Sequence, residues 1–262
     1  MRENLVRKKW ASGQAALGGW LGVPSAFSAE VMAHAGFDWL CVDMQHGLID
    51  YQQMVSMLQA MAATEVTPLV RVPWNEPGII GKALDAGALG VIVPMVNSPE
   101  EAQAAVAACR YAPQGRRSFG PLRASTHYGS DYFSRANAEV CCIVMIETRQ
   151  AVERVDEILS VRGIDAVYVG PADLSVTLGL PPGADNADPS FGNALSRIVE
   201  SCRRHNIVPG IAGNAAIAPK RIEQGFRLCE VASDARLIAA GAAQALQQVR
   251  PTSAPAAKAA YL

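Results

Sequence analysis

The sequence predicts a (β/α)8 barrel that occupies residues 1–250 as one domain. The chain has 262 residues, half of them apolar, and barrels of this kind use about 250 residues. Short apolar runs alternate with helical segments eight times, which is typical of buried parallel strands that are each followed by a helix. No Gly-x-Gly-x-x-Gly follows the first run, and no Gly-Lys-Ser/Thr occurs. We therefore prefer a closed barrel to an open doubly wound sheet, and we expect no nucleotide cofactor.

The predicted strands are short apolar runs that end near Pro, Gly or a charged residue. The first run, from Ala16 to Val23, contains several glycines but is bounded by Pro24-Ser25. We predict strands at residues 16–23, 37–44, 67–72, 90–95, 140–147, 164–170, 207–212 and 227–232.

The predicted helices carry end signals. Ser28 is a candidate N-cap with Gly36 at the far end, and Ser98-Pro-Glu-Glu is a strong helix start because the Ser caps, the Pro fits the first turn and the acids favour the helix dipole. We predict helices at residues 3–12, 28–36, 50–63, 77–88, 98–108, 151–159, 189–205, 218–224 and 234–249.

Two segments interrupt this alternation. Residues 110–138, rich in Gly, Arg, Ser and Tyr, are too long for an ordinary connection, so we expect either an active-site loop or an inserted excursion. Residues 251–262 are predicted to be a flexible C-terminal tail.

Composition excludes several function classes. The net charge of −1 and the scattered Lys and Arg residues predict no nucleic-acid partner and no membrane partner. The six cysteines lack Cys-x-x-Cys spacing, which favours buried thiols in a reducing compartment over a zinc cluster. Neither a signal peptide nor a membrane-spanning run is recognisable. We expect a cytoplasmic protein.

Two carboxylates follow neighbouring predicted strands. Glu147 and Asp173 are 26 residues apart, about the length of a strand, helix and returning parallel strand. We therefore expect both at one mouth of the barrel, where they would suit a hard divalent cation such as Mg²⁺ or Mn²⁺. The alternative is that Glu147 is a loop carboxylate and Asp173 a helix N-cap.

Other polar groups fall at predicted strand ends, where barrels place their chemistry. Arg71 follows Leu69-Val70 and would present a two-donor fork to a carboxylate, or else form a buried ion pair with Asp43. His46 is the only one of the four histidines at a strand end and is a candidate proton acceptor; a structural His is the alternative. Asp85 is either its partner or an exposed helix acid.

The segment Gly170-Pro171-Ala172-Asp173 is the most specific of these signals. Gly and Ala allow a substrate to approach the backbone closely, and the N–H groups of Ala172 and Asp173 could meet an anionic oxygen. An ordinary Gly-Pro turn is the alternative.

Five ordered motifs resemble a known family over nearly the whole chain, from about Trp20 to Val249. They are Phe37-Asp-Trp-Leu-Cys-Val-Asp-Met-Gln-His-Gly, Pro68-Leu-Val-Arg-Val-Pro, Gly90-Val-Ile-Val-Pro-Met, Ile146-Glu-Thr and Val169-Gly-Pro-Ala-Asp-Leu-Ser. The chain thus resembles the HpcH/HpaI family of class II pyruvate-dependent aldolases. The resemblance implies a (β/α)8 barrel whose last helix is exchanged between subunits, assembled as a homo-hexamer built from trimers.

The resemblance also implies roles for individual residues. Glu147 and Asp173 match metal ligands, Arg71 matches a contact to the pyruvate carboxylate, and His46 with Asp85 matches a His-Asp dyad. Gly170, Pro171 and Ala172 match a backbone cradle for pyruvate, and Arg123 matches a loop that can reach a neighbouring subunit's site. Apart from these matches, the apolar residues Trp20, Val23 and Ala212 are expected at the mouth, where they favour tolerance toward the aldehyde.

Two positions depart from the usual family pattern. Gln45 stands where a Glu usually precedes the His, and Met145 stands where many members have a Gln. Both changes remove a polar or charged group near the expected metal centre, which puts metal affinity and aldehyde preference in doubt.

The implied activity is a reversible, metal-dependent cleavage of 4-hydroxy-2-oxo acids to pyruvate or hydroxypyruvate and an aldehyde, with Mg²⁺, Mn²⁺ or Co²⁺. Lys82 and Lys220 are the only lysines between Lys9 and Lys258, and neither is at a strand end, so we expect no Schiff base and no pyridoxal phosphate. The alternatives are an oxaloacetate decarboxylase, an acyl-CoA lyase like the citrate lyase β barrels, and a non-catalytic 2-oxo acid binding protein.

Overall fold

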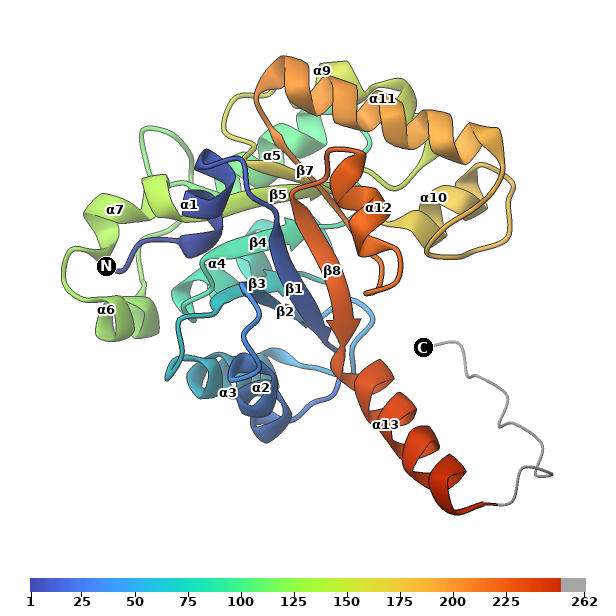
Figure 1. The fold of residues 1–262 in the computed structure, drawn as a ribbon. Helices are drawn as coiled ribbons and strands as arrows, with labels where there is room; N and C mark the ends of the chain where they lie inside the picture. The colour runs from blue at the N-terminus through green and yellow to red at the C-terminus, as the bar shows by residue number, and fades with distance from the viewer. Residues whose placement is uncertain (251–262) are drawn as a thin grey trace.

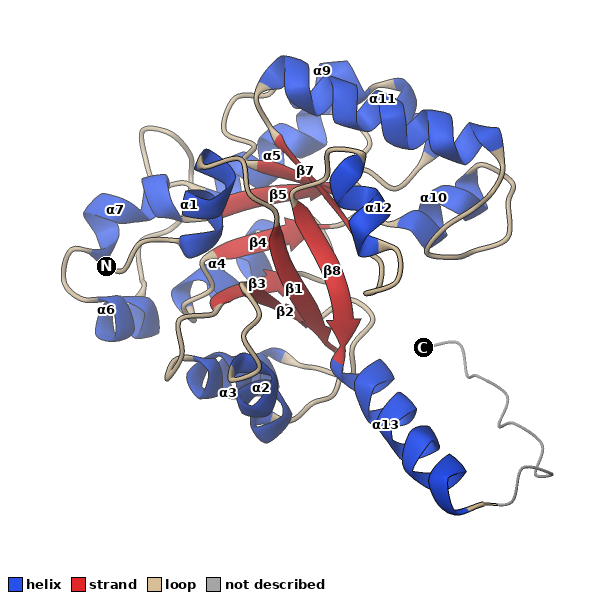
Figure 2. Cartoon of the chain, in the orientation of Figure 1, coloured by secondary structure: helices blue, strands red, loops and turns tan. Residues whose placement is uncertain are grey.

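The computed structural model describes residues 1–250, in which eight parallel strands close into a barrel in sequence order (Figures 1 and 2). Each strand pairs with the next, and β8 pairs with β1. The predicted (β/α)8 barrel is thereby confirmed. The strands are β1 (Ala16–Leu21), β2 (Trp39–Asp43), β3 (Thr67–Arg71), β4 (Gly90–Val93), β5 (Cys141–Met145), β6 (Ala166–Val169), β7 (Val208–Ile211) and β8 (Leu228–Ser233).

All eight predicted strands are present, with differences at their ends. The paired part of β5 ends at Met145 and that of β6 at Val169, so Glu147 and Gly170 lie just beyond the ladder. The predicted strands are longer than the observed ones because apolar residues continue past the last hydrogen bond between the strands. The site residues therefore stand on short segments that leave the barrel, while the strands below hold them.

Most of the helices lie around the barrel, whereas α13 projects from it (Figure 2). The helices are α1 (Leu5–Ala11), α2 (Ala26–Ala33), α3 (Tyr51–Met61), α4 (Pro77–Asp85), α5 (Pro99–Cys109), α6 (Leu122–Tyr128), α7 (Tyr132–Glu139), α8 (Arg149–Glu153), α9 (Val155–Leu159), α10 (Pro171–Thr177), α11 (Pro189–His205), α12 (Ala218–Glu223) and α13 (Asp234–Val249). None of them is long and apolar enough to cross a membrane.

Some helix predictions need correction. The N-cap of α2 is Ser25, whose Oγ accepts from the Ser28 N–H at 3.1 Å, so the prediction that Ser28 caps this helix is wrong. The predicted helix at 151–159 is divided into α8 and α9 at Arg154. The segment 110–138 is an excursion that contains α6 and α7. The predicted tail at residues 251–262 lies outside the described residues.

The barrel interior is filled by large side chains from several strands. Trp39, Leu69, Ile143 and Tyr168 are all buried there. Gly18 on β1 makes room for them, because a Cβ at this position would stand 2.0 Å from the Trp39 ring. A larger apolar layer packs between the strands and the outer helices. The barrel is therefore a packed core, and open space is left only toward its ends.

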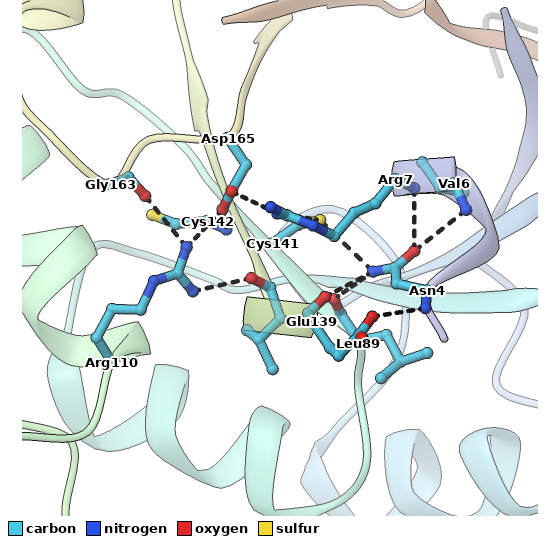
Figure 3. Close-up of polar contacts among 11 residues, drawn as sticks. Asn4, Val6, Arg7, Leu89, Arg110, Glu139, Cys141, Cys142, Gly163 and Asp165 are labelled. Carbon is cyan, nitrogen blue, oxygen red and sulfur yellow. Dashed lines mark hydrogen bonds and ion pairs between the residues drawn. The ribbon is translucent and has the colours of Figure 1, made fainter. Parts of the chain in front are cut away.

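The amino end of the barrel is held by a charged network (Figure 3). Asp165, just before β6, accepts from Arg7 Nη1 and from Arg110 Nη2, each at 2.5 Å, and from the Cys142 N–H at 2.8 Å. Asn4 joins it by donating to the Leu89 and Glu139 carbonyls. The network ties α1 and α5 to the starts of β5 and β6, and so fixes the end opposite the predicted site.

Candidate active site

A cavity of about 630 Å³ lies at the carboxyl ends of the strands. Its walls contain most of the residues that the sequence singled out for the mouth, together with several that it did not. They are Trp20, Asp43, His46, Arg71, Met145, Tyr168, Gly170, Pro171, Ala172, Asp173, Pro182, Gly183, Ala184, Ala212, Gly213, Glu230, Ser233 and Arg236. Another cavity, of about 740 Å³, lies by α1 and α2 and is lined by Asp38 and Val66. It is at the amino ends of β2 and β3, where barrels do not place their chemistry.

Glu147 is a buried carboxylate directly beneath this cavity. Its side chain follows β5, is 2% exposed, and accepts the Met95 N–H on Oε1 at 2.8 Å. Met95 has φ +56°, a conformation that is unusual for a residue with a Cβ and that turns this N–H toward the acid. Oε2 faces Gly170, where a Cβ would stand 2.4 Å away. Gly170 is therefore required by the position of Glu147.

Electrostatics make the Glu147 carboxylate ready to accept a cation. Burial raises the pKa of Glu147 to about 7; the charge of Asp173 adds to this rise, while the Met95 N–H and Arg71 oppose it. A buried acid of this kind gains much by binding a metal ion, which offsets the lost hydration.

Asp173 is the second carboxylate of the pair. It lies in the first turn of α10, is exposed to the cavity and makes no capping hydrogen bond. The interpretation of Asp173 as an N-cap is therefore wrong. No group of three or more His, Cys, Asp or Glu that could hold a metal occurs within residues 1–250. The two carboxylates nevertheless fit a hard divalent cation that takes few protein ligands and keeps positions for substrate and water.

Arg71 enters the same cavity and is held by Asp43. Its Nε and Nη2 donate to the two Asp43 carboxylate oxygens at 2.8 and 2.6 Å, because the parallel register places the two residues side by side. The guanidinium also stacks on the Trp20 ring at 4.5 Å. The alternative interpretation of Arg71, an ion pair with Asp43, is thus realised. A guanidinium has five N–H donors and the fork to Asp43 uses two, so donors remain for a substrate carboxylate.

His46 is an exposed residue of the turn after β2 and lines the cavity. Its backbone N–H donates to Asp43 Oδ1 at 3.3 Å. Asp85 lies elsewhere, at the end of α4, where its Oδ1 accepts from Arg117 at 2.7 Å and its side chain lines other cavities. Arg123 also points away from the mouth and donates to the Ala86 and Leu58 carbonyls. Within the described part of one chain, the structure does not bring His46 to Asp85 or Arg123 to the mouth.

The two unusual positions also lie at this end of the barrel. Met145 lines the cavity, and its Cε would be 3.2 Å from a Cβ placed on Gly170. Gln45 Oε1 is buried and has no hydrogen-bond partner among residues 1–250. The floor beside Glu147 is therefore apolar where a polar side chain was expected from the resemblance.

Sequence reasoning missed a second ion pair at the mouth. Glu230 on β8 is 5% exposed and pairs with Arg236 from the first turn of α13. Burial raises the pKa of Glu230 to about 7, although Arg236 and the Gly213 N–H favour its charged form. One signal was available: Glu230 interrupts an apolar run, and a lone acid inside a predicted strand needs a partner.

Comparisons with known proteins agree with this architecture. The chain is 41% identical over 248 residues to a "Hydroxypyruvate/pyruvate aldolase" from Rhizorhabdus wittichii, covering 94% of this chain and 99% of the relative. It is 38% identical over 244 residues to a "4-hydroxy-2-oxo-heptane-1,7-dioate aldolase" from Salmonella dublin, covering 92% of each. A crystal structure of an HpcH/HpaI aldolase/citrate lyase family protein from Burkholderia cenocepacia superposes with a TM-score of 0.88 at 35% identity, covering 95% of this chain and all of that one. The family description "HpcH/HpaI aldolase/citrate lyase" matches residues 17–240, and the chain belongs to this family.

Proposed function

We propose that this protein is a divalent-metal-dependent aldolase that reversibly cleaves 4-hydroxy-2-oxo acids to pyruvate or hydroxypyruvate and an aldehyde. The observation that carries the proposal is that Asp173, Gly170 and Arg71 line one cavity, while the carboxylate of Glu147 lies directly against Gly170. Support comes from relatives named as aldolases for these substrates. We propose Mg²⁺, Mn²⁺ or Co²⁺ as the cation, because two carboxylates with open positions suit all three.

The groups at the mouth have different roles in this reaction. When bound, a divalent cation supplies Lewis-acid stabilisation of the negative charge that develops on the 2-oxo group as the C3–C4 bond breaks. Arg71 keeps unused N–H donors beside Trp20 and binds the substrate carboxylate. The absence of side-chain bulk at Gly170 and Ala172 lets the substrate reach the first turn of α10, whose N–H groups lack helical partners.

His46 is the candidate base for the C4 hydroxyl. It stands exposed in the cavity, on the turn that Asp43 holds, and a neutral imidazole accepts a proton near pH 7. In the direction of synthesis it would return that proton to the new alkoxide. The position of Asp85 away from this cavity means that a dyad with His46 would have to use Asp85 from a second copy of the chain.

We also propose a homo-hexamer built from trimers, in which α13 is exchanged and Arg123 approaches a neighbouring mouth. In the single chain, α13 projects from the barrel (Figure 1), and its apolar side chains Leu237, Ile238 and Leu246 are 47%, 59% and 45% exposed. A helix with an uncovered apolar stripe is expected to pack on another subunit.

The cytoplasmic location remains a prediction.

Removal of the cation tests the proposed function. EDTA is expected to abolish cleavage of a 4-hydroxy-2-oxo acid, and Mn²⁺, Mg²⁺ or Co²⁺ to restore it, because the developing charge is otherwise unstabilised. Full activity in EDTA, with borohydride trapping of a lysine adduct, would contradict the metal mechanism.

Product analysis separates the rival functions. A decarboxylase would release pyruvate from oxaloacetate faster than it cleaves the 4-hydroxy acid, and an acyl-CoA lyase would require a thioester. A non-catalytic binding protein would bind pyruvate without exchanging its methyl protons in D₂O.

A further inference from the structure

The ion pair of Glu230 and Arg236 forms one wall of the cavity. The proposed reaction assigns no role to it. Arg236 Nη2 donates to Glu230 Oε1, and Glu230 Oε2 accepts from the Gly213 N–H at 2.9 Å. The Arg236 side chain is 35% exposed while that of Glu230 is 5% exposed. The acid is therefore the buried support, and the guanidinium is the group that reaches the cavity.

Arg236 is held in place at each of its three nitrogens. Besides the pair with Glu230, Nε donates to Ser233 Oγ at 2.9 Å and Nη1 donates to the Gly213 carbonyl at 3.0 Å. These bonds use three of the five N–H donors of a guanidinium. One N–H on Nη1 and one on Nη2 remain without a partner among residues 1–250, and the Ser233 hydroxyl accepts from Arg236 without donating there. The wall thus offers positioned donors with little freedom left to lose on binding.

The charges around the cavity argue against a second anion on the substrate. Arg71 is matched by Asp43, and Arg236 is matched by Glu230. Glu147 and Asp173 would be matched by a divalent cation, and the 2-oxo acid itself adds one carboxylate. No positive charge is left over for another anionic group, which would also approach Glu230. An uncharged hydroxyl group meets no such repulsion and takes the unused donors.

We propose that Arg236 and Ser233, positioned by Glu230, bind a hydroxyl group of the aldehyde half, so that the preferred acceptor is a short, uncharged hydroxyaldehyde. This inference rests on the proposed aldolase function and names the substrate class of the same site. The remaining walls near the pair, Trp20 and Ala212, are apolar and suit contact with the carbon chain of such a molecule.

The test compares three aldehydes with pyruvate as the donor: glyceraldehyde, propanal and succinic semialdehyde. They are assayed at pH 8 with Mn²⁺, above the pKa of about 7 to which burial raises Glu230, so that the pair is charged. In the wild type, kcat/KM for glyceraldehyde should exceed that for propanal by at least about tenfold, the scale of a hydrogen bond to a charged group. The Arg236→Met variant should bring this ratio close to one.

Two further variants make the comparison interpretable. Arg236→Met leaves Glu230 buried without its cation, so the double variant Glu230→Leu/Arg236→Met removes both charges together. In this double variant, too, the ratio of kcat/KM for glyceraldehyde to that for propanal should fall close to one. Arg204→Met is the matched control, because Arg204 pairs with Asp156 on the outside of the molecule, where both are about half exposed. This control should keep the wild-type ratio, and melting temperatures verify that each variant is folded.

Exchange of the pyruvate methyl protons in D₂O distinguishes a failure of the proposed aldolase function from a failure of the inference on Arg236. If the wild type shows no exchange with Mn²⁺, the proposed aldolase function itself fails. If exchange occurs but propanal is used as well as glyceraldehyde, the inference on Arg236 is overturned. It is also overturned if the folded double variant retains the glyceraldehyde preference, or if succinic semialdehyde is the preferred acceptor and loses that preference in Arg236→Met.

Discussion

Asp43 organises several of the functional groups at the mouth. It is 7% exposed, and its two oxygens accept both donors of the Arg71 fork. Oδ1 also accepts the backbone N–H groups of Gln45 and His46 at 3.0 and 3.3 Å. One buried carboxylate therefore sets both the orientation of the guanidinium and the turn that carries the imidazole. Preorganisation of this kind lets the reacting groups meet the substrate without further ordering.

Replacement of His46 tests its role as the base. We expect His46→Ala to lower the rate of aldol cleavage at least about 10²-fold, the usual scale for a lost general base. Steady-state kinetics with a saturating cation measure this. His34→Ala is the control, because His34 caps the end of α2, outside the cavity. An unchanged rate in His46→Ala would assign the proton transfer to another group.

The raised pKa of Glu230 predicts that the free energy of unfolding depends on pH. Burial raises its pKa to about 7 from an ordinary 4.5, against the opposing charges of Arg236 and Arg71 and with a small contribution from Asp43. The folded state thus holds this proton more tightly than the unfolded state does. The resulting stabilisation is complete below about pH 4.5 and is lost as the pH rises through about 7; its size is on the order of 3 kcal/mol.

The measurement is urea denaturation of the wild type and Glu230→Gln between pH 5 and 8, both in EDTA. The free energy of unfolding should fall more steeply with pH in the wild type, because the variant has no carboxyl to titrate at this position. The same buffer keeps the contribution of Glu147 equal in the two proteins. Parallel curves would show that Glu230 titrates near its ordinary pKa.

The residues at strand ends were the most predictable part of the site. A barrel presents the ends of its strands at one mouth, which predicts His46, Arg71 and Asp173 there, and all three line the cavity. Glu230 and Arg236 were missed because their pairing depends on how α13 leaves β8, which no local pattern encodes. For Asp85 and Arg123 the sequence could match a family role, but it could not say which copy of the chain a side chain faces.

At the scale of elements, the two ends of the barrel have different roles: one carries the candidate active site and the other stabilises the strands. The mouth carries unused donors and two buried acids with a raised pKa, Glu147 and Glu230. The opposite end carries ion pairs and hydrogen bonds around Asp165 (Figure 3). Arg110 beside it is only 5% exposed, so this aspartate is needed to balance a buried cation. The amino end therefore supplies stability to the strands that hold the site at the other end.

Asp165→Asn tests this division. We expect the free energy of unfolding to fall by about 3 kcal/mol, because two guanidinium groups lose their shared anion and one of them is buried. Aldol cleavage at 25 °C should be retained, since the change is at the far end of the barrel. Asp156→Asn, in an exposed pair with Arg204, should cost less than about 1 kcal/mol. Equal losses in the two variants, measured by urea denaturation, would contradict a structural role for the network.

Helix ends could be predicted where a capping residue acts locally, as at Asp50 and Ser98. The excursion at 110–138 could not, because its helices depend on distant contacts. Tyr128 and Tyr132, from α6 and α7, are buried with Leu89 in a separate cluster. Neither helix has a side-chain cap hydrogen bond, so packing, rather than local sequence, decides where they begin.

At the scale of the whole molecule, α13 is the feature that a single chain leaves without a partner. Asp234 is the only buried residue of this helix, Asp234–Val249. Its carboxylate accepts the N–H groups of Gly22 and Val23 at 2.9 and 3.1 Å, which fixes the helix to the mouth at its first turn. Beyond that turn, Ile238, Ala242, Leu246 and Val249 are exposed at spacings that place them on one face.

Charged substitutions on this face test the proposed assembly. Ile238→Asp/Leu246→Asp should reduce the mass in solution from six chains of 27.7 kDa to a smaller species, because each aspartate would have to be buried without a cation. Light scattering after gel filtration measures the mass. Gln247→Asp lies on the opposite face of the helix and should leave the assembly intact. If Asp85 acts on the His46 of a neighbouring copy of the chain, the smaller species should also lose cleavage activity. The mouth residues of each chain, Glu147 and Arg236 among them, are unchanged in this variant. An active monomer would show instead that every catalytic group comes from one chain.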